Sequence, residues 1–328
     1  MFDETILGHD EIRSRLFSRL NAGTLSGAML FVGAEGVGKR RVAMELAQRE
    51  ICFRRSACGI CEGCLIFKSE PLPKEFPNML RIAPEGKAGI IKVNAIREDD
   101  LVEGGIIHWA YQAPAPNCHK WILIEDAHRL GKIGANILLK TLEEPPPGTF
   151  FILVSHTPAS VLPTIQSRAE RIAFGTLEPE VIGKIAVANG WKTSELDSWT
   201  AISNGTLKYL DRDLFDRASS QIEAWVSIME GTPFVGVSEK LLPKSGDVAQ
   251  SKQLAMAMEQ LLIVLDDLSR LQAGKPSRLA DWRERIDSIA KTQRNIKTSY
   301  KYTLDAMRAL NRNVTPEAIL RKISLSLC

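Results

Sequence analysis

The sequence predicts an α/β fold, with a parallel sheet covered by helices on both faces, followed by an all-helical second half. Three observations support this prediction. In the first half, short apolar runs alternate with helical stretches, which is typical of a parallel sheet covered by helices. A glycine-rich loop, residues 33–40, joins the first apolar run to the first long helical stretch. After Phe174 the apolar runs cease, and helical patterns continue along the rest of the chain.

The predicted strands are short apolar runs of the kind that a buried parallel sheet requires. They span residues 28–32, 79–82, 121–124 and 150–154. Helical stretches lie between them at residues 39–50, 93–103 and 135–143. The last of these stretches ends before the prolines at 145–147, because proline cannot continue a helix.

The second half shows only helical patterns. Two helices, at residues 178–189 and 206–215, fit a small lid. Further helices follow at residues 218–229, 248–271, 282–302 and 316–325. The sequence therefore predicts three domains: an α/β domain over 1–175, a helical lid domain over 176–215 and an all-helical domain over 216–328.

The composition is that of an ordinary globular protein, with 45% hydrophobic and 25% charged residues among 328. The acidic N-terminus lacks the apolar segment of a secretory signal, and no run of about 18 apolar residues exists to span a bilayer. We therefore expect a cytoplasmic protein with no membrane partner, in which clustered cysteines bind metal before they form disulfides. The net charge is only +3, but residues 270–328 hold 13 Lys and Arg against 5 Asp and Glu. This basic region is either a surface that faces nucleic acid or a solvated helix face.

The loop GAEGVGKR, residues 33–40, departs from a phosphate-binding loop at its last residue. In the pattern G-x-x-x-x-G-K-[ST], backbone N–H groups cradle phosphates, the Lys reaches the β- and γ-phosphates, and the final hydroxyl binds Mg²⁺. The pattern is retained at Gly33, Gly36, Gly38 and Lys39. Arg40, in the last position, has no acceptor atom and cannot bind a metal. A strand before the loop and a helix after it still predict a P-loop fold, and the alternative is a turn that only glycine fits.

The acidic residues that belong to such a loop are altered as well. A P-loop fold binds Mg²⁺ through an acid at the end of a strand, and here Glu125 and Asp126 follow residues 121–124 in inverted order. We expect hydrolysis at this site to be absent or weak, because Arg40 and Mg²⁺ would compete for one place. Whether ATP and Mg²⁺ still bind is left open by the sequence. We also predict that Arg40 or Lys39 pairs with one of the acids, since uncompensated, partly buried carboxylates are costly.

Four cysteines lie within 13 residues, a spacing that predicts a metal site. They are Cys52, Cys58, Cys61 and Cys64. Two overlapping C-x-x-C units and a fourth thiol can close a tetrahedral site for structural Zn²⁺, which leaves no open position for catalysis. Gly59 and Gly63 suit turns that wrap a zinc ion. The alternatives are an iron–sulfur cluster, which also binds to closely spaced thiolates, and incidental buried cysteines.

Several motifs, in this order along the chain, resemble the AAA+ subunits of the bacterial DNA polymerase III clamp loader. They are Ile6-Leu7-Gly8-His9, the P-loop with its four-cysteine insertion at 52–64, ILIEDAHRL, LLKTLEEPP, FILVSHTP and Ser167-Arg168. Near the C-terminus, LNRNVTP at residues 310–316 resembles the motif of the family's collar domain. The resemblance spans nearly the whole chain. It implies an AAA+ domain over 1–175, a lid, and a helical collar for oligomerisation over 216–328.

The departures from the family pattern favour the delta-prime type over the gamma/tau type. Gamma/tau-type ATPases resemble full ATPases, with Ser or Thr after the P-loop Lys, Asp-Glu after the third strand, and Ser-Arg-Cys later in the chain. This chain has Arg40, Glu125-Asp126 and Ser167-Arg168-Ala169 at these places. The resemblance maps the residue that senses the γ-phosphate onto Ser155, with His156 beside it as the second candidate. It maps the sensor arginine of the lid onto Lys208.

From the residues alone, Ser167-Arg168 is only a helix end with an exposed cation. The resemblance implies more for Arg168: an arginine finger that reaches the ATP site of a neighbouring gamma/tau subunit and stabilises charge on the γ-phosphate. It also implies a rigid stator in a five-subunit ring with gamma/tau and delta subunits, which loads the sliding clamp onto primed DNA. The alternatives are an active gamma/tau-type ATPase that tolerates Arg40, and a zinc-finger reader of nucleic acid.

Overall fold

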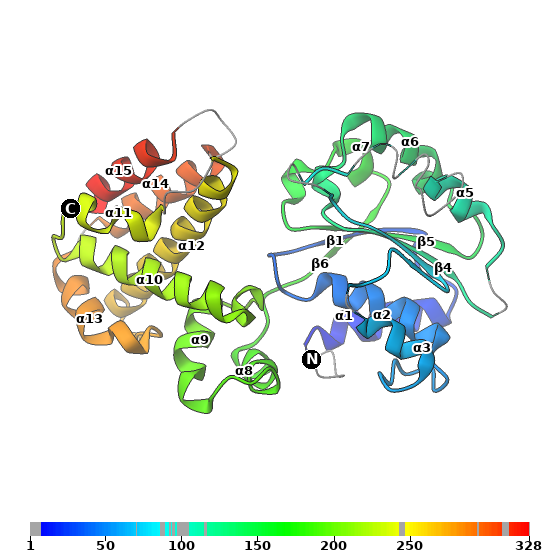
Figure 1. Ribbon diagram of the computed structural model, residues 1–328, viewed down its shortest axis with the longest axis horizontal. Coiled ribbons are helices and arrows are strands. Elements are labelled where there is room, and N and C mark those ends of the chain that lie inside the picture. Colours follow the sequence, from blue (N-terminus) through cyan, green and yellow to red (C-terminus); the bar gives the residue numbers. More distant parts are fainter. Residues whose placement is uncertain are drawn as a thin grey trace. The chain divides into compact units, whose positions relative to one another are not determined.

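The computed structural model describes residues 8–69, 71–85, 89–91, 93, 96, 105–114, 117–242, 247–293, 295–309 and 315–327. The chain divides into two compact units, Met1–Val181 and Ile182–Cys328. The described part of the first unit is a sheet with helices, and the described part of the second unit is helical (Figure 1). All elements that the structure describes after Phe174 are helical, as the change of sequence pattern there predicts.

Among the described residues of the first unit, six strands form a sheet in the order β2-β3-β4-β5-β1-β6. Their bounds are β1 Ala28–Val32, β2 Glu75–Phe76, β3 Met79–Ile82, β4 Lys120–Ile124, β5 Thr149–Ser155 and β6 Glu170–Ala173. The strand pairs are parallel except for the short pair of β2 and β3. The four predicted strands are confirmed to within one residue at each end. The strands β2 and β6 are absent from the prediction.

Helices cover both faces of the sheet, as predicted (Figure 1). One face carries α1 (Asp10–Asn21), α2 (Lys39–Ile51) and α3 (Glu62–Leu65), and the other carries α5 (Gly105–Tyr111), α6 (Lys132–Glu143) and α7 (Pro163–Gln166). Alternate residues of β1 point to opposite faces, so Phe31 lies in the core that contains Val42 of α2, whereas Leu30 lies in the core that contains Leu138 of α6. β1 is therefore buried along its whole length, and the glycine-rich loop follows directly after its carboxyl end.

Two of the predicted helices of the first unit are confirmed. The predicted helices at 39–50 and 135–143 correspond to α2 and α6. The helix predicted over 93–103 lies almost entirely outside the described residues. The helices α1 and α5 were not expected from the sequence patterns.

The part of the second unit that the structure describes has its helices around one apolar core. They are α9 (Leu196–Ser203), α10 (Arg212–Met229), α11 (Phe234–Leu241), α12 (Asp247–Gln272), α13 (Arg283–Thr292), α14 (Ile296–Ala309) and α15 (Pro316–Leu327), while α8 (Pro179–Ala188) spans the boundary between the units. Trp225 of α10 is fully buried in this core, and its indole N–H donates to the carbonyl of Ala257 on α12 at 2.7 Å. The helices predicted at 178–189, 248–271 and 316–325 are confirmed as α8, α12 and α15.

The single helix predicted over 206–215 is wrong. A short 3₁₀ helix, Lys208–Leu210, comes first, and α10 begins only at Arg212. The break has a local cause: Asp211 has an extended backbone and caps α10, since its carboxylate accepts the N–H of Leu214 at 3.0 Å. α10 then continues to Met229, so the predicted domain boundary at 215/216 lies inside a helix. The separation of lid and collar stays a prediction.

The helix predicted over 282–302 is also wrong, because it is two helices. α13 ends at Thr292, where Gln293 takes an extended backbone, and α14 begins at Ile296. The apolar pattern of the two helices runs on across the break, which is why periodicity alone joins them. None of the helices in the described ranges combines the length and the apolar character that crossing a bilayer demands.

Candidate functional site

The glycine-rich loop connects β1 to α2, and its glycines are required by the backbone. Gly33, Gly36 and Gly38 have φ angles of 153°, 79° and 97°, which side chains disfavour. Gly33 has a second reason, since a Cβ there would lie 2.4 Å from the carbonyl oxygen of Phe174. Phe174 follows β6, and its N–H donates to the carbonyl of Val32 at 2.7 Å. The loop therefore has the strand–loop–helix context of a P-loop, and its glycines are explained by geometry alone.

Lys39 points into the loop. Its Nζ donates to the carbonyl of Gly33 at 2.8 Å and to the carbonyl of Ala34 at 2.5 Å, and the residue is only 5% exposed. Burial lowers the pKa of Lys39 to about 8. The ammonium thus has hydrogen-bond acceptors within the loop itself. In a nucleotide-binding P-loop, this lysine contacts the phosphates of the bound nucleotide instead.

Glu125, which follows β4, is neutralised by two arginines. Arg81 of β3 approaches it closely, with Nε 2.5 Å from Oε1, while Nη1 of Arg40 lies 3.5 Å from Oε2. The Glu125 side chain is 13% exposed and that of Arg40 is 52% exposed. The predicted pairing of Arg40 with an acid is therefore present, although Arg81 is the closer partner. Arg81 was missed by the sequence analysis, and its only signal is a charged residue within an apolar strand.

Asp126, Ser155 and His156 meet at the carboxyl ends of β4 and β5. Asp126 has a left-handed backbone with φ 48°, and its Oδ1 lies 3.2 Å from Nδ1 of His156. This hydrogen bond holds the pKa of Asp126 below its usual value. Ser155 is fully buried, and its Oγ accepts the N–H of Thr157 at 3.1 Å. The loop and the residues expected around it are thus brought to one edge of the sheet.

His128 belongs to the same group and was missed by the sequence analysis. It lies in a short 3₁₀ helix, Ala127–Arg129, directly after the two acids, and its Nδ1 is 3.2 Å from Oγ of Ser155. Its ring meets the ring of His156 edge-on, with centroids 4.4 Å apart. Burial lowers the pKa of His128 to about 4, so the imidazole is neutral near pH 7. The histidine two residues after Asp126 is the signal that could have found it.

Lys208 and Arg168 have ion-pair partners of their own. Lys208 belongs to the second unit, where its Nζ is 2.7 Å from Oε2 of Glu259. Arg168 follows α7, with its Nε 3.1 Å from Oε2 of Glu143 and its Nη1 donating to the carbonyl of Thr164 at 3.2 Å. Arg168 thus lies at a helix end, as expected, but its side chain is only 31% exposed and is paired with Glu143. Its role as an arginine finger stays a prediction.

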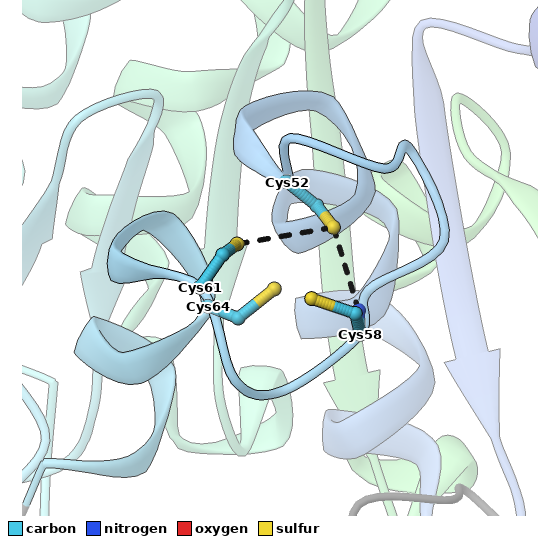
Figure 2. Close-up of side chains that lie close together, drawn as sticks. All are labelled: Cys52, Cys58, Cys61 and Cys64. Carbon is cyan, nitrogen blue, oxygen red and sulfur yellow. Dashed lines mark hydrogen bonds between the residues drawn. The ribbon is translucent and has the colours of Figure 1, made fainter.

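The four cysteines converge, and Figure 2 shows their side chains pointing toward one another. Cys52 follows α2 and Cys64 lies in α3, and both are buried. All four sulfurs lie within 4.8 Å of one another, and those of Cys61 and Cys52 are 4.0 Å apart. A tetrahedral Zn²⁺ with bonds of about 2.3 Å places its sulfurs roughly 3.8 Å apart. The cluster can therefore hold a metal ion with four thiolates, as the spacing predicts.

The surroundings of the sulfurs also suit a metal. Burial raises the pKa of the Cys64 thiol to about 12. For Cys52, burial raises the pKa, but backbone N–H groups, the first that of Cys58, outweigh it and lower the pKa to about 5. The amide of Gln48 is buried beside Cys64, and its Nε2 has no other hydrogen-bond partner among the described residues. A Cys64 thiolate formed by metal binding would supply the acceptor that this amide needs.

The two glycines of this module act differently. Gly59 has φ 74°, a left-handed backbone, and lies in a bend of the loop. Gly63 is needed for a close approach, because a Cβ there would lie 2.3 Å from the carbonyl oxygen of Ile51. The module therefore packs directly against the end of α2.

Residues 8–178, more than half of the chain, match the family described as DNA polymerase III, delta subunit. DNA polymerase III subunit delta' of Bacillus subtilis (strain 168) is 23% identical over 326 residues, which cover 95% of this chain and 94% of that protein. DNA polymerase III subunit gamma/tau of Mycobacterium tuberculosis (strain H37Rv) is 31% identical over 183 residues, 54% of this chain and 29% of that protein. The chain thus spans less than a third of the gamma/tau relatives that it matches.

A crystal structure of a DNA polymerase III gamma subunit-related protein from Thermotoga maritima aligns with a TM-score of 0.43 and 16% identity, over 97% of both chains. The collar-like motif at residues 310–316 lies outside the described residues except for its end. The match over residues 8–178 is the finding that decides the family. The chain belongs to the DNA polymerase III delta-subunit family, one of the clamp-loader AAA+ families.

Proposed function

We propose that this chain is a delta-prime-type subunit of a DNA polymerase III clamp loader whose own P-loop does not turn over ATP. One observation carries the proposal. At the position where the P-loop pattern requires a Mg²⁺-binding hydroxyl, Arg40 extends a guanidinium that pairs with Glu125.

The electrostatics of this pairing oppose Mg²⁺. The carboxylate of Glu125 is already balanced by Arg81 and approached by Arg40, so the place for the ion is lined with positive charge. Two unit charges about 4 Å apart repel by roughly 4 kcal/mol near a protein surface, and a divalent ion doubles this cost. Lys39 also has acceptors in the loop carbonyls. The geometry supports a loop that is kept as architecture.

The relatives support the same assignment. The delta' relative aligns with this chain nearly from end to end, whereas the gamma/tau relative aligns over 29% of its own length. We infer that the chain assembles with gamma/tau and delta subunits in a five-membered ring that places the sliding clamp on primed DNA. In that ring Arg168 would leave Glu143 and reach the ATP site of a neighbouring subunit.

We further propose that the four-cysteine cluster holds one structural Zn²⁺. Its four thiolates would fill the coordination shell, and the ion would fix the loop between α2 and α3. Nothing in this role requires the ion to take part in a reaction.

The competing function is an active gamma/tau-type ATPase, which the 31% identity to gamma/tau and the retained glycines and Lys39 favour. ATP turnover by the purified chain with Mg²⁺ separates the two. The expected rate equals that of Lys39→Ala, which removes the phosphate-binding ammonium. Turnover that Lys39→Ala abolishes would establish the ATPase. Size-exclusion chromatography with gamma/tau and delta subunits should show a stoichiometric complex, and failure to co-elute would overturn the assembly role.

A further inference from the structure

Asp126, His128 and His156 form a cluster of possible metal ligands. Each offers one ligand atom, and these three atoms lie within 4.8 Å of one another. The residues come from the segments after β4 and β5, two neighbouring parallel strands whose carboxyl ends lie side by side. The cluster lies in the first unit and shares no residue with the four-cysteine cluster.

The distances suit a small metal ion. A tetrahedral Zn²⁺ with bonds of about 2.0 to 2.1 Å holds its ligand atoms roughly 3.3 Å apart. Oδ1 of Asp126 and Nδ1 of His156 are 3.2 Å apart, which matches this value. The third ligand atom, on His128, lies within 4.8 Å of the other two, so a small rotation of one ring closes the triangle.

The donor set selects the kind of ion. Imidazole nitrogens suit Zn²⁺, Co²⁺ and Ni²⁺, whereas Mg²⁺ prefers oxygen ligands and keeps several waters. The two imidazoles and one carboxylate make three protein ligands. A tetrahedral ion held by three protein ligands has a fourth position open for water or a phosphate oxygen. The cluster therefore differs in chemistry from the Mg²⁺ site of a P-loop, although Asp126 belongs to the acid pair beside it.

The cluster is also held in place from outside. Nδ1 of His128 lies 3.2 Å from Oγ of Ser155, which is fully buried and accepts the N–H of Thr157. A hydrogen bond of this kind fixes the orientation of a histidine ring, as it does for histidine ligands of metals. Nε of Arg129 lies 3.9 Å from Oδ2 of Asp126, and Nη1 of the same guanidinium donates to the carbonyl of Gly89 at 2.9 Å.

We propose that Asp126, His128 and His156 form a second metal site, which binds a divalent transition ion of the Zn²⁺ class with one coordination position open. The site would give this degenerate P-loop an ion of its own, bound through imidazole where Mg²⁺ binding is opposed by Arg40. This proposal does not depend on the delta-prime assignment, because its three ligands come from one chain.

Co²⁺ titration of the full chain, after removal of metals under reducing conditions, tests the proposal. Wild type should bind two equivalents. One, bound by cysteines, gives intense thiolate-to-cobalt charge-transfer absorption, and the other gives only weak ligand-field bands. His156→Gln should lose the second equivalent and keep the first, whereas Cys61→Ser should do the reverse. His108→Gln, which removes an exposed histidine outside the cluster, should bind like wild type.

Two further variants test whether the second Co²⁺ binds to the whole cluster and not to a single histidine at the surface. Asp126→Asn keeps the size of the side chain and should also lose the second equivalent. Ser155→Ala keeps all three ligands but should weaken Co²⁺ binding there by about 10- to 100-fold, as loss of an orienting partner does. Thermal unfolding without metal shows whether each variant remains folded, and Asp126→Asn replaces His156→Gln if that variant unfolds. A wild-type chain that binds only the thiolate equivalent, or a second equivalent that survives both substitutions, would overturn the proposal.

Discussion

The burial of Lys39 makes a quantitative prediction about stability and pH. Burial lowers the pKa of its ammonium from 10.5 to about 8 in the folded chain. Between these values the unfolded chain binds more protons than the folded chain, so stability must rise with pH across this window. The buried charge costs about 3.3 kcal/mol at pH 7 and about 1.4 kcal/mol at pH 9.5. Raising the pH should therefore return about 2 kcal/mol to the folded state.

Lys39→Met removes the titrating group and supplies the comparison. Urea unfolding of both proteins at pH 7 and pH 9.5, followed by circular dichroism and tryptophan fluorescence, gives the change in the free energy of unfolding. Only wild type should show the extra gain of about 2 kcal/mol at high pH. The variant also loses the hydrogen bonds to the carbonyls of Gly33 and Ala34. This loss lowers its free energy of unfolding equally at both pH values, so it cancels from the difference between them.

Lys132→Met, which removes an exposed lysine at the start of α6, is the matched control and should follow the wild-type curve. If Lys39→Met and wild type depend on pH in parallel, the ammonium is not buried and the loop geometry described above is incorrect.

Three further predictions concern charge and metal. Cys61→Ser should reduce bound zinc from about one ion per chain to none and loosen the cysteine loop while the sheet stays folded; metal analysis that finds iron instead would contradict this. Arg81→Leu should destabilise the chain by about 3 kcal/mol, because it leaves a largely buried carboxylate without its close partner, whereas Arg40→Ser should cost about 0 to 1 kcal/mol; equal costs in urea unfolding would argue against this ranking. Arg168→Ala should leave folding and assembly intact but partly lower ATP turnover of the reconstituted clamp loader, with the exposed Arg171→Ala as control; unchanged turnover would refute the arginine finger.

The interior of the sheet could be predicted from sequence because its strands are buried on both faces. A run such as residues 28–32 is apolar at every position, which few structures other than a covered parallel strand accommodate. The edge strands carry no such signal. β6 reads Glu-Arg-Ile-Ala with exposed positions, and β2 has only two residues, so their pairing depends on neighbours distant in the chain.

In the candidate site, too, some residues could be predicted from the sequence and others could not. The glycines of the loop were predictable because the constraint on each is local, a φ angle or a close contact. The partners of the acids were not, since Arg81 reaches Glu125 only because β3 lies beside β4. His128 and His156 are separated by 27 intervening residues in sequence and meet only because β4 and β5 are neighbours. Periodicity contains no information about that order.

The contact between Gly33 and Phe174 has a consequence for the persistence of the loop. The first residue of the loop touches the backbone at the point where the chain leaves β6, and a single added carbon would collide with it. The loop thus holds the chain as it leaves β6, the edge strand, against the end of β1, the strand beside it. A larger residue at position 33 would displace the chain where it leaves β6, even with no ligand bound. The packing of the sheet therefore requires a glycine at this position whether or not the loop binds a nucleotide.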